Sequence, residues 1–263
     1  MDRKVFLGAI IALLVVAAVL TAGCVGTQSE KKTYIVGIDG DYPPYSYVDE
    51  SGKFAGFDVE SIRWIAEQEG FNVEIKAVAW DGIIPALLGN KIDMVYSGMT
   101  ITPARAAQVT FSKPYWSVDQ GVAVKKGSAV TMDQFKAGDV TIGVQRSCSA
   151  DQYIQSDDFF GQAKYDQMVK DGKIKLYDTF PQSMVALENG LVQTVIFDDV
   201  NIKDYIKAKD AIIILGTIPT GEEYGVAMRN GDTELHTLIN NGLTKLMASE
   251  KWNELLAKYI IEA

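Results

Sequence analysis

Residues 81–98, DGIIPALLGNKIDMVYSG, contain a short helical pattern followed by a buried-strand pattern, and residues 181–198, PQSMVALENGLVQTVIFD, repeat that order. A second pair of similar stretches follows the first: GVAVKKGS at residues 121–128 and GVAMRNGD at residues 225–232. One match alone could arise by chance, because helix–turn–strand units share composition. Two matches in the same order predict two similar lobes, with two extended segments passing between them as hinges.

Strand and helix patterns alternate over the rest of the chain. TYIVGID (33–39) and FNVEIKAV (71–78) have strand patterns, while GFDVESIRWIAEQEG (56–70) has apolar residues at helical spacing, with Asp58 as the expected N-cap and Gly70 as the stop. This alternation predicts an α/β fold with a mainly parallel sheet flanked by helices in each lobe. In such sheets ligands bind beyond the carboxyl ends of the strands.

The N-terminal residues are expected to be a signal peptide rather than part of a lobe. Charged residues open the chain, an apolar run extends from Val5 to Leu20, and small residues lead into Cys24. The pattern resembles a lipobox, although Thr21 stands where leucine is usual; an uncut membrane anchor is the alternative. Lipid on Cys24 would hold the protein at the outer face of a membrane, periplasmic or on the cell surface.

We therefore expect four parts along the chain. They are a lipoprotein-type signal peptide at residues 1–23, a tether at 24–33, a first lobe made of 34–119 and 229–263, and a second lobe at 120–228. The C-terminal helical stretch would close the first lobe.

Composition excludes several classes of function. The 263 residues carry a formal charge of −9, which argues against nucleic acid as a partner. His236 is the only histidine, no CxxC occurs, and Cys148 has no disulfide partner if Cys24 carries lipid. We expect a small, partly buried free thiol at Cys148, no metal site, no cofactor and a monomer.

Arg105 is in an unusual position for a cation. In SGMTITPAR (97–105), Thr102 is the expected N-cap of a helix and Pro103 its first residue. A positive charge in a first helical turn is locally unfavourable, so an anion is expected there, and an arginine fork suits a carboxylate. Ser97 and Thr100 could add hydroxyl donors; the alternative is that Arg105 is a surface residue paired with an acid.

Asp198 ends an apolar strand in the second lobe, at the position that corresponds to Gly98 in the first. It could cap the following helix, but Asp199 could do so equally, which would leave Asp198 to meet a cation. A carboxylate-binding arginine in one lobe and an ammonium-binding aspartate in the other describe an α-amino acid site. Only a zwitterion would then bridge both lobes and favour closure.

Three residues could frame the ligand's side chain. Tyr42 lies in the proline-containing loop DGDYPPYSY, and Trp80 precedes a helix; both follow strands of the first lobe, although aromatic residues are more often core. Asp39, at the end of the first strand, could accept a polar or cationic side chain, or could be a turn residue.

These stretches resemble a known family. GIDGDYPPYSY, GKFAGFDVE, WDGIIPALLGNKIDMVYSGMTITPARAAQVTFSKPYW and FDD are similar to the extracellular solute-binding proteins, family 3, of polar amino-acid ABC transporters, from about Tyr34 to the C-terminus. The resemblance implies a type II periplasmic-binding-protein fold that closes on one amino acid.

The resemblance also implies residue roles. Arg105 would bind the ligand carboxylate with help from Thr100, Ser97 and Gly98, and Asp198 would bind the ammonium. Tyr42 and Trp80 would flank the side chain, with Asp39 near its far end. In the family a stretch like GVQAGTT supplies further donors, which points to Cys148 and Ser149; here it reads GVQRSCS (143–149), and Arg146 departs from the pattern.

The expected function is therefore capture of a polar amino acid and its delivery to an ABC transporter permease, without chemistry. One alternative is an enzyme resembling cyclohexadienyl dehydratases, which act on arogenate or prephenate, with Glu222 or Glu223 as the acid or base. Another is a ligand-sensing domain, which is less expected because the chain ends at Ala263 after its last helix. The ligand's side chain stays open: Asp39 permits arginine, lysine, histidine or glutamine, whereas an inward Arg146 would favour an acidic or neutral one.

Overall fold

A computed structural model describes residues 31–207 and 209–261 of the chain. The predicted signal peptide, the lipidation site at Cys24 and most of the tether lie outside these residues. Among the helices of the described residues, none has the length and apolar character needed to cross a membrane.

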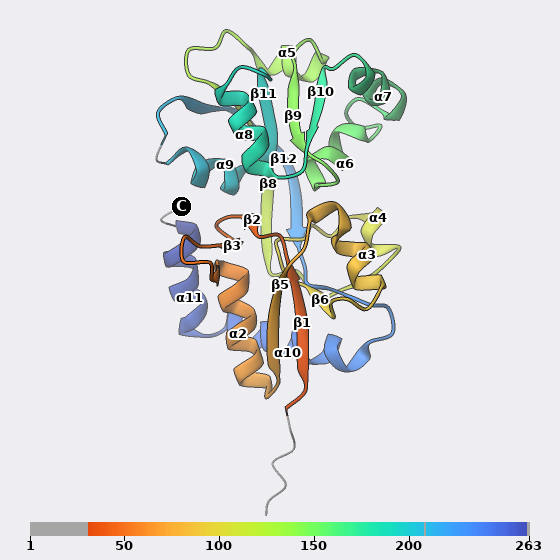
Figure 1. The fold of residues 1–263 in the computed structure, drawn as a ribbon, viewed down its shortest axis with the longest axis vertical. Coiled ribbons are helices and arrows are strands. Elements are labelled where there is room, and N and C mark those ends of the chain that lie inside the picture. Colours follow the sequence, from red (N-terminus) through yellow and green to blue (C-terminus); the bar gives the residue numbers. More distant parts are fainter. Residues whose placement is uncertain (1–30, 208, 262–263) are drawn as a thin grey trace, which may run out of the picture. The chain divides into compact units, whose positions relative to one another are not determined.

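The first lobe is built on a five-stranded sheet with the strand order β5-β1-β6-β13-β7 (Figure 1). Its strands are β1 (Thr33–Ile38), β5 (Asn72–Ala77), β6 (Met94–Val95), β7 (Thr110–Phe111) and β13 (Ala227–Met228). A small second sheet contains β2 (Asp41–Tyr42), β3 (Ser46–Val48) and β4 (Phe54–Ala55). The helices of this lobe are α2 (Phe57–Glu69), η1 (Trp80–Gly82), α3 (Ile83–Leu88), α4 (Pro103–Ala106), α10 (Thr233–Met247), α11 (Glu250–Leu256) and the π-helical turn η2 (Ala257–Ile261).

The second lobe has a sheet of the same size, with the order β10-β9-β11-β8-β12. Its strands are β8 (Trp116–Lys125), β9 (Ile142–Gln145), β10 (Ile174–Tyr177), β11 (Thr194–Asp198) and β12 (Ile212–Tyr224). Its helices are α5 (Met132–Ala137), α6 (Ser149–Gln155), α7 (Gln162–Lys170), α8 (Phe180–Glu188) and α9 (Asp199–Ile206).

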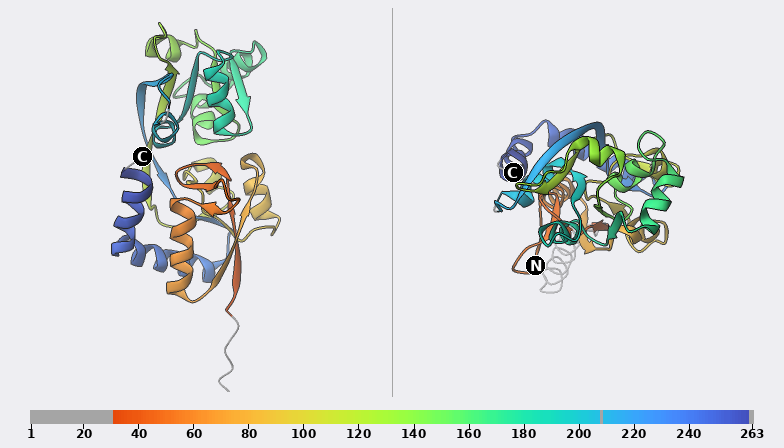
Figure 2. Two further views of the ribbon diagram at one scale, coloured as in Figure 1. Left: turned by 60° about the vertical axis from the view of Figure 1, so that its left-hand side comes forward. Right: turned by 90° about the horizontal axis from the view of Figure 1, so that it is seen from above.

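Two long strands connect the lobes. In Figures 1 and 2, β8 and β12 run side by side from the second sheet toward the first, as predicted for the hinge segments. At the first lobe, Tyr224 forms an isolated bridge with Thr100, and its carbonyl accepts from the amide of Tyr115 at 3.0 Å. The residue limits proposed for each lobe stay a prediction; β13 pairs within the first sheet.

The two repeated stretches occupy equivalent places in the two sheets. Val95 of β6 pairs antiparallel with Ala227 of β13, and Val195 of β11 pairs in the same way with Ala123 of β8. The register is therefore the same in both lobes. β1 and β9 also correspond, since Gly37 pairs with Val95 and Gly143 with Val195.

Both sheets are mixed but mainly parallel, as the sequence patterns predicted. In the first sheet β5, β1, β6 and β7 run in one direction, and β13 runs opposite to its neighbours β6 and β7. In the second sheet β8 runs opposite to its neighbours β11 and β12 in the same way. Each reversed strand enters its sheet directly from the connection between the lobes, without a crossover helix, and therefore pairs antiparallel.

Helix α2 corrects the prediction for Asp58. Its N-cap is Gly56, whose φ of 117° and close approach suit only glycine: a Cβ there would lie 2.3 Å from the carbonyl oxygen of Tyr45. Asp58 lies instead inside the first turn and is fully buried. Gly70 ends the helix in the left-handed conformation, as predicted.

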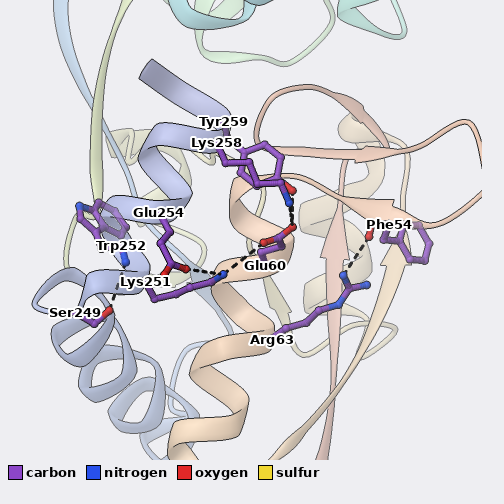
Figure 3. Close-up of polar contacts among 9 residues, drawn as sticks. All are labelled: Phe54, Glu60, Arg63, Ser249, Lys251, Trp252, Glu254, Lys258 and Tyr259. Carbon is purple, nitrogen blue, oxygen red and sulfur yellow. Dashed lines mark hydrogen bonds and ion pairs between the residues drawn. The ribbon is translucent and has the colours of Figure 1, made fainter. Parts of the chain in front are cut away.

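The C-terminal segment contacts α2 of the first lobe (Figure 3). Glu60 of α2 accepts from Lys258 Nζ at 2.6 Å and from the Tyr259 hydroxyl at 2.5 Å, and Lys251 lies 3.9 Å away. Beneath these contacts, Ile62 and Ile65 of α2 belong to the same buried core as residues of α10.

Candidate functional site

A narrow cavity of about 10 Å³ lies between the lobes, next to the carboxyl ends of β1, β9 and β11. All of the predicted ligand-binding residues except Ser97 line it. They are Asp39, Tyr42, Trp80, Gly98, Thr100, Arg105, Cys148, Ser149 and Asp198, and Gln145 and Phe197 complete the wall.

Ser97 lies behind the cavity wall. Its hydroxyl accepts from the amide of Asp39 at 2.9 Å and contacts the Ser46 hydroxyl at 2.7 Å. The side chain is fully buried, so it supports the backbone that carries Asp39 rather than facing a ligand.

Arg105 is held as its local sequence predicted. Thr102 caps α4 by accepting from the amide of Arg105 at 3.3 Å, and Pro103 is the first helical residue. The guanidinium is only 3% exposed, lies over the Trp80 ring at 5.3 Å, and donates to the carbonyls of Thr100 (2.9 Å) and Ser147 (3.1 Å).

In the described part of the chain, Arg105 forms no ion pair with a carboxylate. Burial lowers its pKa, with partial compensation from nearby acidic groups. A buried cation that has only neutral hydrogen-bond partners is unfavourable until an anion reaches it. The site is therefore suited to a carboxylate.

Ser147 of the second lobe contacts both Arg105 and Trp80 of the first lobe. Its carbonyl also accepts from Trp80 Nε1 at 3.1 Å, and its amide donates to Asp151 Oδ2 at 2.9 Å while φ is 61°. Arg146 points elsewhere, since it is exposed and its Nε lies 3.9 Å from Asp178 Oδ1. The departure from the family pattern at residue 146 thus leaves the charge of the cavity wall unchanged.

Asp198 is the acidic centre of the opposite wall. Its Oδ2 accepts from the hydroxyls of Tyr42 (2.5 Å) and Tyr224 (2.8 Å), and its Oδ1 from Gln120 Nε2 (2.6 Å) and Ser149 Oγ (3.4 Å). It occupies the N-cap position of α9, but its side chain makes no capping bond. Burial, followed by the charge of Glu222, raises the pKa of Asp198 to about 6.

Asp39 and Gln145 end the two equivalent strands β1 and β9 and meet across the cavity. Gln145 Nε2 donates to Asp39 Oδ2 at 3.1 Å, and the amide of Asp41 donates to Oδ1 at 2.9 Å. Burial raises the pKa of Asp39, and the hydrogen bonds from Asp41 and Gln145 offset this effect only in part.

The side chains of Thr100 and Cys148 already form hydrogen bonds within the protein, which limits what they can offer a ligand. The Thr100 hydroxyl donates to Glu222 Oε2 at 3.0 Å, so it can offer a ligand only lone pairs. Cys148 caps α6, with Sγ accepting from the amide of Asp151 at 3.4 Å. Burial raises the pKa of Cys148 well above its usual value, which keeps the thiol neutral.

Several site residues were not predicted from the sequence. Gln145 could have been found by aligning β9 with β1, because it corresponds to Asp39. Phe197 precedes Asp198 on β11, and its ring lies edge-on to Tyr42 with centroids 5.8 Å apart. Gln120 and Tyr224 come from the connecting strands, and no local pattern marks them.

Asp58 is the other residue whose role was missed. Its Oδ2 accepts from the amide of Gly98 at 2.6 Å and from the Tyr115 hydroxyl at 3.0 Å. Burial raises its pKa to about 8. This contact holds Gly98 at φ 52°, where a Cβ would lie 2.5 Å from the Tyr42 ring.

Sequence comparison shows which family the chain belongs to. Residues 34–262 match the model of the bacterial extracellular solute-binding proteins, family 3. The chain belongs to this family. A solute-binding protein of Neisseria gonorrhoeae, named as a probable histidine-binding protein, is 31% identical over 87% of this chain and 83% of its own length. The L-cystine-binding protein TcyJ of Escherichia coli K12 is 27% identical over 93% of this chain and 91% of its own.

Solved structures of similar proteins share the fold. An ancestral arginine-binding protein, solved with arginine and with glutamine, has a TM-score of 0.76 and 33% identity over 87% of this chain and 98% of its own. AncCDT-1, described as an ancestral amino acid-binding protein and a precursor of cyclohexadienyl dehydratase, has a TM-score of 0.73 and 31% identity over 87% and 95%. These similar proteins are named for amino-acid binding.

Proposed function

We propose that this family 3 protein captures a free amino acid between its lobes and delivers it to the permease of an ABC transporter. The observation that carries the proposal is the pairing of opposite charges: a buried guanidinium without a carboxylate on one wall, and the buried Asp198 carboxylate on the other. An α-amino acid supplies a carboxylate and an ammonium at suitable spacing. Binding would thus relieve two unfavourable buried charges at once.

We further propose that the protein acts as a monomer, outside the cytoplasmic membrane, with lipid on Cys24 as its anchor. The family's extracellular character supports the location, and the lipobox-like sequence supports the anchor.

For the ligand's side chain, we propose a basic or polar group that reaches Asp39. Asp39, Arg105 and Asp198 together carry one excess negative charge, so a ligand with a net positive charge would balance the cavity. Arg146, the residue that would have favoured an acidic ligand, lies on the surface. Relatives named for arginine and histidine support a basic side chain.

The dehydratase alternative requires a free acid or base in the cavity. Glu223 is exposed, and both oxygens of Glu222 accept hydrogen bonds, from Gln120 and Thr100. Binding is therefore the better supported function. A turnover assay with prephenate and arogenate tests the alternative.

Thermal unfolding of the purified protein with each of the twenty amino acids tests the proposed function. A ligand at 100 times its Kd stabilises the folded state by about 2.7 kcal/mol. For a chain of this size we expect the midpoint to rise by roughly 5–10 °C, most strongly with arginine or lysine. No shift with any amino acid, in folded protein free of carried-over ligand, would contradict the proposal.

Asp39→Asn should change which amino acid binds. Removing one partner of a buried charge pair costs roughly 2–5 kcal/mol, so we expect the Kd for arginine to rise at least about 30-fold. Glutamine, which needs no counter-charge, should lose less than about tenfold. Calorimetric titration measures both, and the exposed Asp41→Asn is the matched control. Equal losses for the two ligands would place their side chains away from Asp39.

A further inference from the structure

Glu222 reaches the groups behind the cavity wall, Gln120 and Thr100, through an irregularity in β12. Ile218 pairs with Gln120 of β8, and regular antiparallel pairing would then place Thr220 opposite Val118; Glu222 stands there instead. Gly221, at φ 59°, makes the turn, and its amide donates to Asp119 Oδ1 at 2.9 Å. Bulges of this kind re-aim a side chain. Here Glu222 points inward, while its neighbour Glu223 is exposed.

The Glu222 carboxylate shares its partners with Asp198. Gln120 Nε2 lies 3.1 Å from Glu222 Oε1, 2.6 Å from Asp198 Oδ1 and 3.2 Å from Ser149 Oγ. The other oxygen, Oε2, accepts from the Thr100 hydroxyl at 3.0 Å. One amide group therefore holds two carboxylates, and Glu222 forms no ion pair within the residues that the structure describes.

We propose that Glu222 is a positioning residue of the ammonium site: it adds a second negative charge beside the ligand's α-ammonium and holds Gln120 and Thr100 in place around Asp198. This assignment rests on the proposed function. Because Glu222 lies on a connecting strand and Thr100 on the first lobe, the contact also joins the hinge to the site.

The pH dependence of ligand binding, which follows the protonation of Asp198, distinguishes this role of Glu222 from a purely structural one. The charge of Glu222 raises the pKa of Asp198, in addition to burial. The other titratable or charged groups around the two carboxylates are Arg105 of α4, Cys148 and Tyr153 of the α6 region, Tyr42 of β2, Tyr45 that follows it, and Tyr224 of β12. Burial raises the pKa of each of these tyrosines and of the thiol, so they stay protonated in the range where Asp198 titrates.

Glu222→Gln removes the charge and keeps the size of the side chain. We expect the Kd for L-arginine at pH 7.5 to rise roughly tenfold, as for the loss of one charge several ångströms from the ammonium in a partly buried site. We also expect the pH at which binding is half lost on acidification to fall by about half a unit or more, because a nearby like charge no longer opposes ionisation of Asp198.

The test is calorimetric titration of the purified protein with L-arginine from pH 5 to 8, on wild type, Glu222→Gln and Glu223→Gln. The last variant removes the same charge from the exposed adjacent position, and its Kd and pH midpoint should match wild type. Identical behaviour of the two variants overturns the assignment of Glu222. So does a higher Kd with an unmoved midpoint, since that would indicate packing alone.

Glu222→Asp is the second variant, which keeps the charge on a shorter side chain. Its pH midpoint should remain that of wild type, and a downward shift there also overturns the proposal. If wild type binds neither arginine nor any other amino acid, the proposed function itself fails. If wild type binds an amino acid but the variants do not behave as expected, only the assignment of Glu222 fails.

Discussion

Arg105→Ala is expected to abolish ligand binding while leaving the protein folded. The guanidinium is the group on the cavity wall that can neutralise the ligand carboxylate, and it is 3% exposed. Truncating one partner of a buried, hydrogen-bonded charge pair costs roughly 2–5 kcal/mol, so the Kd should rise by at least about 30-fold. Calorimetric titration with the best ligand from the thermal screen measures the loss.

The same variant should not lower the stability of the ligand-free protein. Without a ligand, the Arg105 guanidinium donates only to the carbonyls of Thr100 and Ser147, and burial disfavours its charge. Its removal relieves that cost, and we expect an unfolding midpoint at or above that of wild type. Arg63→Ala, on the exposed side of α2, is the matched control and should bind normally. Wild-type affinity in Arg105→Ala would disprove the assignment of the carboxylate site.

Asp198→Asn should cause the second large loss. The substitution keeps the shape that Tyr42, Tyr224 and Gln120 surround but removes the charge that is proposed to meet the ammonium. We expect the Kd to rise by at least about 30-fold. Asp199→Asn is the control, because Asp199 pairs with Lys203 on α9 and does not line the cavity. Greater damage from Asp199→Asn would move the ammonium site to that residue.

We also expect Asp198 to set the pH dependence of binding. Its pKa is raised to about 6, so it is ionised at pH 7.5 and becomes neutral as the pH falls through 6. Affinity should decline over that interval in wild type and stay level in Asp198→Asn. In the ligand-free protein the sign for stability is opposite: a raised carboxyl pKa means that the folded state loses stability as the pH rises from the usual value of 3.8 toward 6.

The sequence was sufficient for the fold class and for choosing most of the residues that line the cavity. Helical and strand periodicity predicted the alternating elements, and the repeat at residues 81–98 and 181–198 predicted two lobes whose sheets proved to share one register. Thr102 and Pro103 predicted the start of α4 and hence the position of Arg105. Periodicity and helix capping are local signals, because they depend on residues a few positions apart, and the repeat is visible when two stretches of the chain are compared.

Asp58 shows where local reasoning fails. A residue two positions after a glycine, at the start of an apolar helical pattern, fits an N-cap, but the close approach of Gly56 to Tyr45 starts the helix earlier. The carboxylate then lies in the interior, where it binds the amide of Gly98, 40 residues away. A cap preference of about 1 kcal/mol cannot decide against such packing.

Short sequence patterns by themselves determined the elements, their order, the duplication and the residues at the ends of β1, β6 and β11. Only the tertiary structure decided that Gln145 faces Asp39, that Gln120, Tyr224 and Glu222 surround Asp198, and that Arg146 points away from the cavity. The physical reason is that the contacts of Gln145, Gln120, Tyr224 and Glu222 join different lobes or connecting strands, while the direction of Arg146 follows from its pairing with Asp178. They depend on the register of the strands and on the position of the hinge. Neither feature produces a periodic pattern in the sequence.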